Sequence, residues 1–320
     1  MNPKVKVLLF LLCLTGIFVF MREYVKQPPL LPDDCTCVCE KGDSGLMSGP
    51  DQGWFATRFN KNMQPFLSAN YSLPEEAFNW WKFLQYEKRS YKVYEATMKG
   101  LLEMFPSTPN LPKPSPNHNH YRTCAVMGNS GNLRGSRYGP LIDANEVILR
   151  MNTGRVEGYE ADVGHRTTHR IMYPESALDL EDNTHLVLFP FKIQDLEWLV
   201  KALSTGFSGT SYMPVKSKIK ANKDLVMVIN PAFMKYVHET WLGKKGRYPS
   251  TGFIALLMAL HICDEVNVFG FGADKDGNWS HYWEALTNKR LKTGVHPGTQ
   301  EYDIILALAK QLKIKFYRGW

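Results

Sequence analysis

The sequence predicts a single α/β domain, built on a mostly parallel sheet of about seven strands that helices flank on both sides. Two observations lead to this fold class. After residue 121, short runs rich in β-branched and aromatic residues alternate with longer helical runs, as in parallel sheets joined by crossover helices. The 320 residues, 44% of them hydrophobic, are also sufficient to bury one large core.

The predicted elements follow in chain order. A helical region covers residues 75–89, a second helix covers 93–104, and a loop over 106–120 leads into the sheet. Strands are predicted at residues 123–128, 147–152, 169–173, 185–191, 224–230, 265–272 and 313–318. Helices are predicted at residues 196–204, 231–242, 251–263 and 299–312. The result is a Rossmann-like open sheet, in which ligands bind beyond the carboxyl ends of the strands.

An apolar run over residues 7–21 predicts a membrane anchor ahead of this domain. Lys4 and Lys6 precede the run and Arg22 closes it, with no small-residue cleavage site before that charge. An uncleaved signal anchor is therefore expected, with a cleaved signal peptide as the alternative. As a helix the run spans only about 22 Å, which suits the thinner bilayers of the early secretory pathway. The lysines keep residues 1–6 in the cytosol, which leaves the rest of the chain in the lumen.

Residues 22–53 predict a stem and residues 54–320 the lumenal domain. The stem is rich in Pro, Gly, Asp and Ser and has no apolar periodicity, as expected of an extended spacer. In an oxidising lumen, cysteines are candidates for disulfides, and Asn-x-Ser tripeptides are candidates for glycosylation. These candidates are Cys35, Cys37, Cys39, Cys124, Cys263, Asn70 and Asn278.

The formal net charge of +7 makes an anionic partner plausible, such as a nucleotide or a membrane surface. The basic residues are spread along the chain, however, whereas a nucleic-acid binder needs a basic stripe. Nucleic acid is therefore not expected as a partner.

A polar turn follows the first predicted strand, at Gly128-Asn129-Ser130-Gly131-Asn132. Its glycines allow backbone N–H groups to approach a phosphate. It is neither a Walker loop nor a G-x-G-x-x-G fingerprint, and an ordinary strand exit is the alternative. Asn152 and the stretch 173–176 end the next two strands at the same edge of the sheet.

Residues 248–252, with the sequence Tyr-Pro-Ser-Thr-Gly, open a predicted helix on this ligand side. The hydroxyls and free backbone donors at its positive end suit a phosphate or carboxylate, and simple capping of the helix is the alternative.

Two histidines lie near the same edge. His281 comes after the strand that ends in Gly270-Phe271-Gly272, and His296 comes before the last helix. The positive end of that helix disfavours an imidazolium, so His296 is a candidate base. A surface or structural histidine is the alternative for each.

The stretch Asp274-Lys275-Asp276 is a competing signal, because metal-dependent glycosyltransferases hold a metal on an Asp-x-Asp after a strand. A solvated turn is the alternative, and the one we expect.

Four ordered stretches together closely resemble the motifs of the eukaryotic sialyltransferase family. The likeness is strongest to beta-galactoside alpha-2,3-sialyltransferases that act on Gal-beta-1,3-GalNAc, and it covers the chain from Trp54 onward. The large motif runs from Cys124 to about Tyr173, the small motif from Arg247 to Gly272, the third from His281 to Glu284, and the very small motif is His296 and Glu301.

The resemblance implies a domain of modified GT-A type that transfers sialic acid from CMP-sialic acid to the 3-hydroxyl of galactose. His296 is then the general base, His281 supports the departing phosphate, and Tyr248 and Gln85 face the acceptor. Tyr173 and Tyr212 look like the tyrosines that reach the donor phosphate. The implied donor-binding residues are Asn129, Ser130, Gly131, Asn152, Tyr173, Tyr212, Ser250, Thr251, Gly252, Gly270 and Gly272.

The family needs no metal and no cofactor, and its members are single-pass type II proteins of the Golgi membrane. Its linking disulfide matches Cys124 and Cys263, and the acceptors it implies are galactose-terminated O-glycans and possibly glycolipids.

Two positions depart from the close relatives of this branch. Tyr121 replaces a cysteine that pairs with the stem in those relatives, so the stem trio has an odd member and a disulfide-linked dimer is one possibility. Ser280 replaces a histidine and creates the sequon at Asn278, so close to His281 that we expect only Asn70 to be glycosylated.

Two other functions remain open at this point. One is a metal-dependent glycosyltransferase that uses Asp274 and Asp276. The other is a catalytically inactive glycan-binding protein, against which the presence of both His281 and His296 argues.

Overall fold

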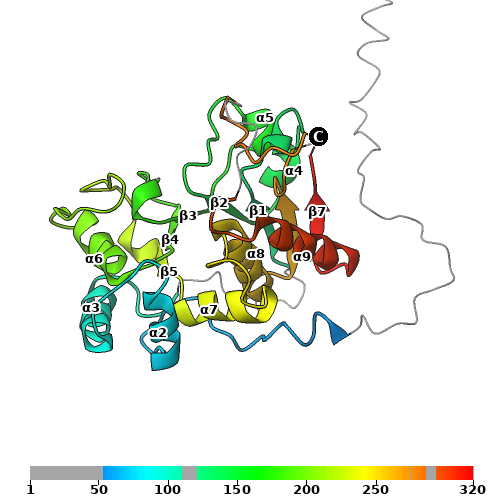
Figure 1. Ribbon diagram of the computed structural model, residues 1–320. Helices are drawn as coiled ribbons and strands as arrows, with labels where there is room; N and C mark the ends of the chain where they lie inside the picture. The colour runs from blue at the N-terminus through cyan, green and yellow to red at the C-terminus, as the bar shows by residue number, and fades with distance from the viewer. Residues whose placement is uncertain (1–52, 110–120, 275, 286–292, 320) are drawn as a thin grey trace, which may run out of the picture. The chain divides into compact units, whose positions relative to one another are not determined.

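The computed structural model describes residues 53–109, 121–274, 276–285 and 293–319, all within one compact unit. Its centre is a seven-stranded sheet in the order β5-β4-β3-β2-β1-β6-β7, in which every neighbouring pair is parallel (Figure 1). The strands are β1 (Thr123–Met127), β2 (Val147–Met151), β3 (His169–Met172), β4 (His185–Leu188), β5 (Val226–Val228), β6 (Glu265–Phe269) and β7 (Lys315–Tyr317). The predicted α/β class and sheet are confirmed.

Two apolar cores cover the opposite faces of the sheet. Along β1, Cys124 and Val126 belong to the larger core, whereas Ala125 and Met127 belong to the smaller one. This alternation follows from the two-residue period of a strand. Because both faces are buried, the strands read as nearly continuous apolar runs.

Helices join the strands and form a layer on each face of the sheet. α6 (Ile193–Ala202) links β4 to β5, α8 (Thr251–Ile262) links β5 to β6, and α9 (Gly298–Lys310) links β6 to β7. α8 is apolar all round and packs on β1, β2 and β6. On the other face lie the short helices α4 (Gly139–Asp143) and α5 (Glu160–Val163), which contact each other.

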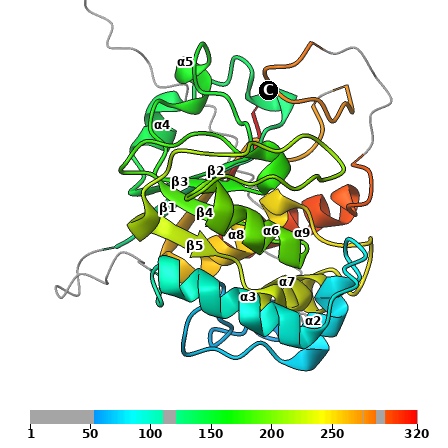
Figure 2. The same ribbon diagram turned by 90° about the vertical axis from the view of Figure 1, so that its left-hand side faces the viewer.

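The first two helices form an outer layer. α2 (Glu75–Lys82) and α3 (Tyr91–Met104) lie next to each other (Figure 2). α3 packs on α6, and α2 packs on α7 (Pro231–Tyr236), which continues as a π-helical turn over Val237–Trp241.

The structure corrects several predicted boundaries. The strands end earlier than expected, because residues with positive φ follow them: Asn152 (52°) after β2, and Gly270 (67°) after β6. β5 begins only at Val226, since Asn222 caps a short 3₁₀ turn before it. α6 begins three residues before the predicted start, at Ile193.

The largest correction concerns the helix predicted over 75–89, which ends at Lys82. Beyond it, the Glu87 carboxylate accepts the backbone N–H of Ile193 at 2.9 Å, and Arg89 bonds both Glu87 and Glu197. These contacts hold the segment against the start of α6. Good helix formers predicted a helix here, and tertiary contacts override that preference.

Cys124 and Cys263 form a disulfide, with their Cα atoms 6.1 Å apart and a separation of 139 positions in sequence. The predicted anchor over 7–21 and residues 22–52 of the predicted stem, with its three cysteines, lie outside the described residues. In the part of the chain that the structure describes, none of the helices has the length and apolar character needed to cross a bilayer.

Candidate active site

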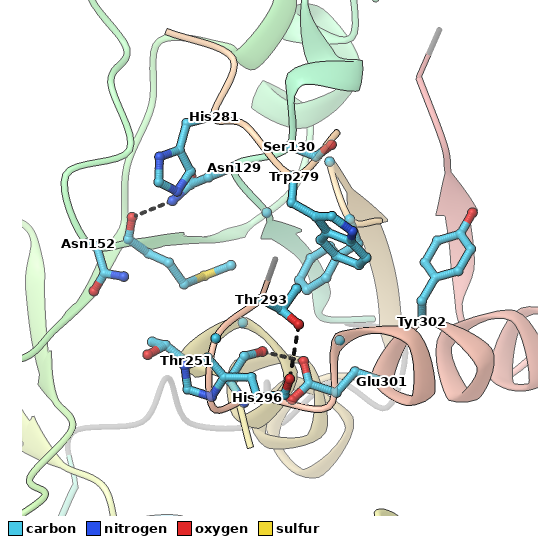
Figure 3. A pocket seen from close by; sticks show the side chains of 18 of the residues that line it. Asn129, Ser130, Asn152, Thr251, Trp279, His281, Thr293, His296, Glu301 and Tyr302 are labelled. Carbon is cyan, nitrogen blue, oxygen red and sulfur yellow. Dashed lines mark hydrogen bonds between the residues drawn. The ribbon is translucent and has the colours of Figure 1, made fainter. Parts of the chain in front are cut away.

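A cleft of about 550 Å³ opens at the carboxyl edge of the sheet. It is lined by the loops after β1, β2, β3 and β6 and by the first turns of α8 and α9. Open α/β sheets bind ligands at this edge. Figure 3 shows His281 and Asn129 on one wall, and His296 and Glu301 on the facing wall.

Every residue predicted to bind donor or acceptor, or to act in catalysis, lines this cleft except Gly131. Gly131 instead donates its backbone N–H to the Ser280 carbonyl at 2.8 Å. The predicted residues brought together are Gln85, Asn129, Ser130, Asn152, Tyr173, Tyr212, Tyr248, Ser250, Thr251, Gly252, Gly270, Gly272, His281 and His296.

Two glycine turns build the wall that carries Asn129. A Cβ on Gly128 would overlap the Gly270 carbonyl, so the turn after β1 can approach the turn after β6 only because residue 128 is glycine. The Ser130 N–H donates to the Gly270 carbonyl at 3.0 Å. The Asn129 side chain reaches the β2 end, where its Nδ2 donates to the Met151 carbonyl at 3.3 Å.

Asn152 holds a left-handed backbone conformation, with φ of 52°. Its Oδ1 accepts the Ser176 hydroxyl at 3.0 Å, so the amide nitrogen is the donor left for a ligand. Its carbonyl accepts from Arg170, a buried guanidinium whose pKa burial lowers to about 10. Arg170 therefore remains charged at neutral pH and places a positive charge beneath this loop. Strained residues of this kind gather at functional sites.

Ser250 links the first turns of α8 and α9. Its hydroxyl accepts the Phe253 N–H at 3.1 Å, which caps α8. The Glu301 carboxylate accepts the Ser250 N–H at 2.7 Å and its hydroxyl at 2.6 Å. Glu301 is 7% exposed, and burial raises its pKa to about 7 against the lowering effect of these two bonds. The pair holds the α8 N-terminus, with Thr251 and Gly252, at the cleft.

His296 is held by the main chain of Tyr248. Its Nδ1 lies 3.1 Å from the Tyr248 carbonyl, and the two rings meet edge to face at 5.0 Å. A carbonyl only accepts, so Nδ1 carries the proton and Nε2 of the neutral ring keeps a lone pair. Burial lowers the pKa of His296, which the Tyr248 carbonyl partly offsets. The residue is thus a neutral imidazole with a free basic nitrogen.

His281 sits on the opposite wall in a charged setting. Its Nδ1 is 2.8 Å from the Glu284 carboxylate, and its ring stacks on Trp283 at 4.6 Å. A backbone bridge to Ser130 ties it to the turn after β1. The hydrogen bonds from His281 are the main cause that lowers the pKa of Glu284.

Two of the cleft tyrosines, Tyr173 and Tyr248, are connected through the ring of Phe191. Tyr173 packs on Phe191 at 6.1 Å, and Phe191 packs on Tyr248 at 5.4 Å. Burial raises the pKa of Tyr173, Tyr212 and Tyr248. Their hydroxyls are therefore protonated at neutral pH and can donate hydrogen bonds.

Several lining residues were not predicted as site residues, among them Phe271, Trp279, Thr293 and Tyr302. Glu301 was named only as part of a motif. These positions have no distinctive pattern in the sequence, because nothing local marks a loop or helix residue as one that faces a cleft. Only the tertiary arrangement brings these side chains to the cleft.

Asp274 is used within its own turn. Its Oδ1 accepts the backbone N–H groups of Asp276 at 2.9 Å and Asn278 at 2.8 Å, and both its oxygens accept the Asn278 amide at 3.0 Å. Lys275 lies outside the described residues. Within the described ranges, no three His, Cys, Asp or Glu side chains gather in a group that could hold a metal ion.

The two sequons differ in exposure. Asn70 lies exposed in a turn, whereas Asn278 is 4% exposed. An N-glycan attaches to the Nδ2 atom of asparagine. In Asn278 this atom is buried in the Asp274 turn, where it donates a hydrogen bond to the Asp274 carboxylate.

The sequence of this chain is similar to those of known proteins. The sequence profile of glycosyltransferase family 29 (sialyltransferase) matches residues 66–313. A CMP-N-acetylneuraminate-beta-galactosamide-alpha-2,3-sialyltransferase 1 of Gallus gallus is 48% identical over 302 residues, covering 93% of this chain and 85% of that protein. A CMP-N-acetylneuraminate-beta-galactosamide-alpha-2,3-sialyltransferase 2 of Mus musculus is 46% identical over 293 residues, covering 91% of this chain and 81% of that protein.

A solved structure is similar as well. It is described as a mammalian sialyltransferase in complex with Gal-beta-1-3GalNAc-ortho-nitrophenol. It is 44% identical in sequence, has a TM-score of 0.77, and the match covers 86% of this chain and 97% of that one.

Proposed function

The chain belongs to glycosyltransferase family 29, the sialyltransferases, and on that premise we propose that it transfers sialic acid from CMP-sialic acid to the 3-hydroxyl of a terminal galactose. It is an enzyme of the glycosyltransferase class, and its relatives are named alpha-2,3-sialyltransferases. The observation that supports the finer proposal best is the shared cleft. His281 and His296, distant in sequence from the first loops, line the same cavity as Asn129 and Asn152.

The donor occupies the wall made by the first three strands and α8. Asn129 and Asn152 offer amide groups for the cytidine and ribose. Thr251 and Gly252 lie in the first turn of α8, where the positive end of a helix favours anions. Arg170 adds a buried positive charge beneath the Asn152 loop. This setting suits CMP-sialic acid, which carries a phosphate and a carboxylate.

His296 is the general base in this mechanism. Its Nε2 takes the proton from the galactose 3-hydroxyl while that oxygen attacks the anomeric carbon of sialic acid. The bond from that carbon to the phosphate oxygen breaks, and its electron pair leaves with CMP. One direct displacement inverts the configuration at the anomeric carbon. The donor already has a good leaving group, so alignment, a base and charge stabilisation suffice.

His281 stabilises the departing phosphate. This role requires a proton on each ring nitrogen, so that one N–H binds the Glu284 carboxylate and the other is available to the phosphate. Tyr173 and Tyr212 donate their hydroxyls to the same group. Tyr248 and Gln85 face the acceptor, for which we propose Gal-beta-1,3-GalNAc on O-glycans, with glycolipids as the alternative carrier. No step in this scheme uses a metal.

The rest of the proposal concerns the setting of the domain. The fold is of modified GT-A type, and residues 7–21 anchor a single-pass type II protein in the Golgi membrane, with its domain over 54–320 in the lumen. The odd cysteine of the stem trio gives a disulfide-linked dimer. Nonreducing electrophoresis that shows only monomer overturns the dimer, and carbonate extraction that releases the full chain from membranes overturns the anchor.

The test of the activity is transfer with linkage mapping. The full chain, expressed in the secretory pathway and solubilised in detergent, is incubated with CMP-sialic acid and a panel of galactosides. We expect transfer to Gal-beta-1,3-GalNAc, and a product that an alpha-2,3-specific sialidase cleaves. A product with another linkage, or donor hydrolysis without transfer, contradicts the proposal.

A further inference from the structure

A buried group of charges lies behind the acceptor side of the cleft, and none of its members has a role in the mechanism above. The Lys192 ammonium lies 2.7 Å from Asp195 Oδ1 and 3.4 Å from Glu175 Oε1. The Lys192 side chain is 13% exposed, that of Glu175 is 3% and that of Asp195 is 2%. Burying charges to this degree is costly unless they are paired, so such a cluster needs an explanation.

The third bond of Lys192 leads to the cleft. Its ammonium donates to Oε1 of Gln85 at 3.1 Å. An ammonium has only donors, so Gln85 must present its carbonyl oxygen to Lys192. The amide nitrogen then has its two N–H groups directed elsewhere, and no acceptor among the described residues bonds it. Gln85 lines the cleft.

The Gln85 segment lies between α2, which ends at Lys82, and α3, which begins only at Tyr91. Tertiary contacts tie it to α6, because Glu87 accepts the N–H of Ile193 and Arg89 bonds Glu197. Lys192 directly precedes Ile193. The start of α6 therefore holds the segment by its backbone as well as by the ammonium that sets the Gln85 amide.

On the basis of the proposed function, we propose that Lys192 is a positioning residue for the acceptor. By fixing the Gln85 carbonyl, it directs the Gln85 amide N–H groups to a hydroxyl oxygen of the acceptor sugar. A glutamine free to rotate would present its oxygen as often as its nitrogen and would lose this selectivity. Asp195 and Glu175 hold Lys192 in place.

A double-mutant cycle on acceptor affinity tests this inference. We expect Gln85→Ala to raise the acceptor KM about tenfold, the cost of one hydrogen bond between neutral groups, with kcat within about twofold. Lys192→Met should raise KM by a similar factor, and the double variant by less than about twofold beyond either single one. Affinity for CMP should be unchanged in Gln85→Ala. Factors that multiply in the double variant overturn the inference.

A second variant covers the case in which Lys192→Met does not fold, since that change leaves two buried carboxylates unpaired. Gln85→Glu is nearly isosteric and keeps an oxygen for Lys192, but it has no N–H to offer the acceptor. If Lys192 sets the amide as proposed, Gln85→Glu loses as much acceptor affinity as Gln85→Ala. If Gln85→Glu binds the acceptor like the wild type, the inference is wrong.

The outcome separates this inference from the proposed function. Wild-type protein that does not transfer sialic acid to a galactoside overturns both. Wild-type protein that transfers it, with independent effects at Gln85 and Lys192, overturns only the positioning role.

Discussion

His296 donates its Nδ1–H to the main-chain carbonyl of Tyr248 across 3.1 Å, and this bond determines which ring nitrogen can act as a base. The carbonyl cannot donate, so the proton stays on Nδ1 and Nε2 carries the lone pair. Because Tyr248 also lines the cleft, the residue that orients the proposed base is itself part of the proposed acceptor wall. In this proposal, the orientation of the base and the shape of the acceptor site are coupled.

Replacing His296 by Ala is expected to lower the transfer rate by roughly 10² to 10⁴, the usual contribution of a general base. The loops that hold CMP are untouched, so CMP affinity should stay as in the wild type. Initial rates and CMP binding by calorimetry measure the two effects. His165→Ala is the control, since that side chain is 76% exposed and outside the cleft. Unchanged turnover in His296→Ala removes this residue from the mechanism.

Glu301 is expected to make the protein less stable as pH rises from about 4.5 to about 7. Its pKa is 4.5 in a solvated chain and about 7 in the folded protein, so the folded state binds more protons in this window. Stability should fall by at most about 1.4 kcal/mol per pH unit. Chemical denaturation across this range should show the slope in the wild type and not in Glu301→Gln. Glu103→Gln, an exposed change on α3, is the control. A slope that persists in Glu301→Gln contradicts the assignment.

Protonation of His169 is expected to destabilise the folded protein as the pH falls, which is the opposite pH dependence to that of Glu301. Burial, with the neighbouring His185 and Arg122, lowers its pKa from 6.5 to about 3, and its ring stacks on His185 at 4.3 Å. The unfolded chain binds the extra proton between these values, so stability is lost as pH falls from about 6.5 to about 3. In His169→Phe, which can keep the stack, the unfolding free energy should depend less on pH in this window. An equal dependence in both proteins would show that another group titrates.

Chelation is expected to leave transfer within about twofold of the untreated rate, because the proposed mechanism draws on side-chain donors and a base alone. The Asp274 oxygens accept hydrogen bonds within their own turn, so Asp274→Asn should affect thermal stability more than rate. Initial rates with EDTA, and after adding Mn²⁺, measure this. Loss of activity in EDTA that Mn²⁺ restores favours a metal-dependent transferase instead.

Glycosylation is expected at Asn70 and not at Asn278. Asn70 is exposed, whereas the Asn278 Nδ2 is buried and donates to both Asp274 oxygens. A glycan on that nitrogen would have to break the turn. When the protein is made in secretory cells, Asn70→Gln should increase gel mobility and Asn278→Gln should not. A mobility change with Asn278→Gln alone is the contrary result.

Apart from their boundaries, the sequence alone determined where the seven strands and the helices α6, α7, α8 and α9 lie along the chain. Their signal is local, because an apolar run between glycine-rich turns reads as a buried strand wherever it lies. The predicted strands also located the ligand-binding edge of the sheet, because parallel strands place their carboxyl ends together. Most of the lining residues could be named in this way, and the family motifs supplied roles for them.

Only the tertiary structure decided where α2 ends, which ring nitrogen of His296 is free, and which way the Gln85 amide faces. Each depends on partners far away in the chain: Ile193 for Glu87, Tyr248 for His296, and Lys192 for Gln85. A local pattern cannot report such contacts, because hydrogen bonds and burial are set by whatever residue the fold brings within about 3 Å. The sequence therefore predicted many of the residues that line the cleft, and the fold set their partners and the direction of their donors and acceptors.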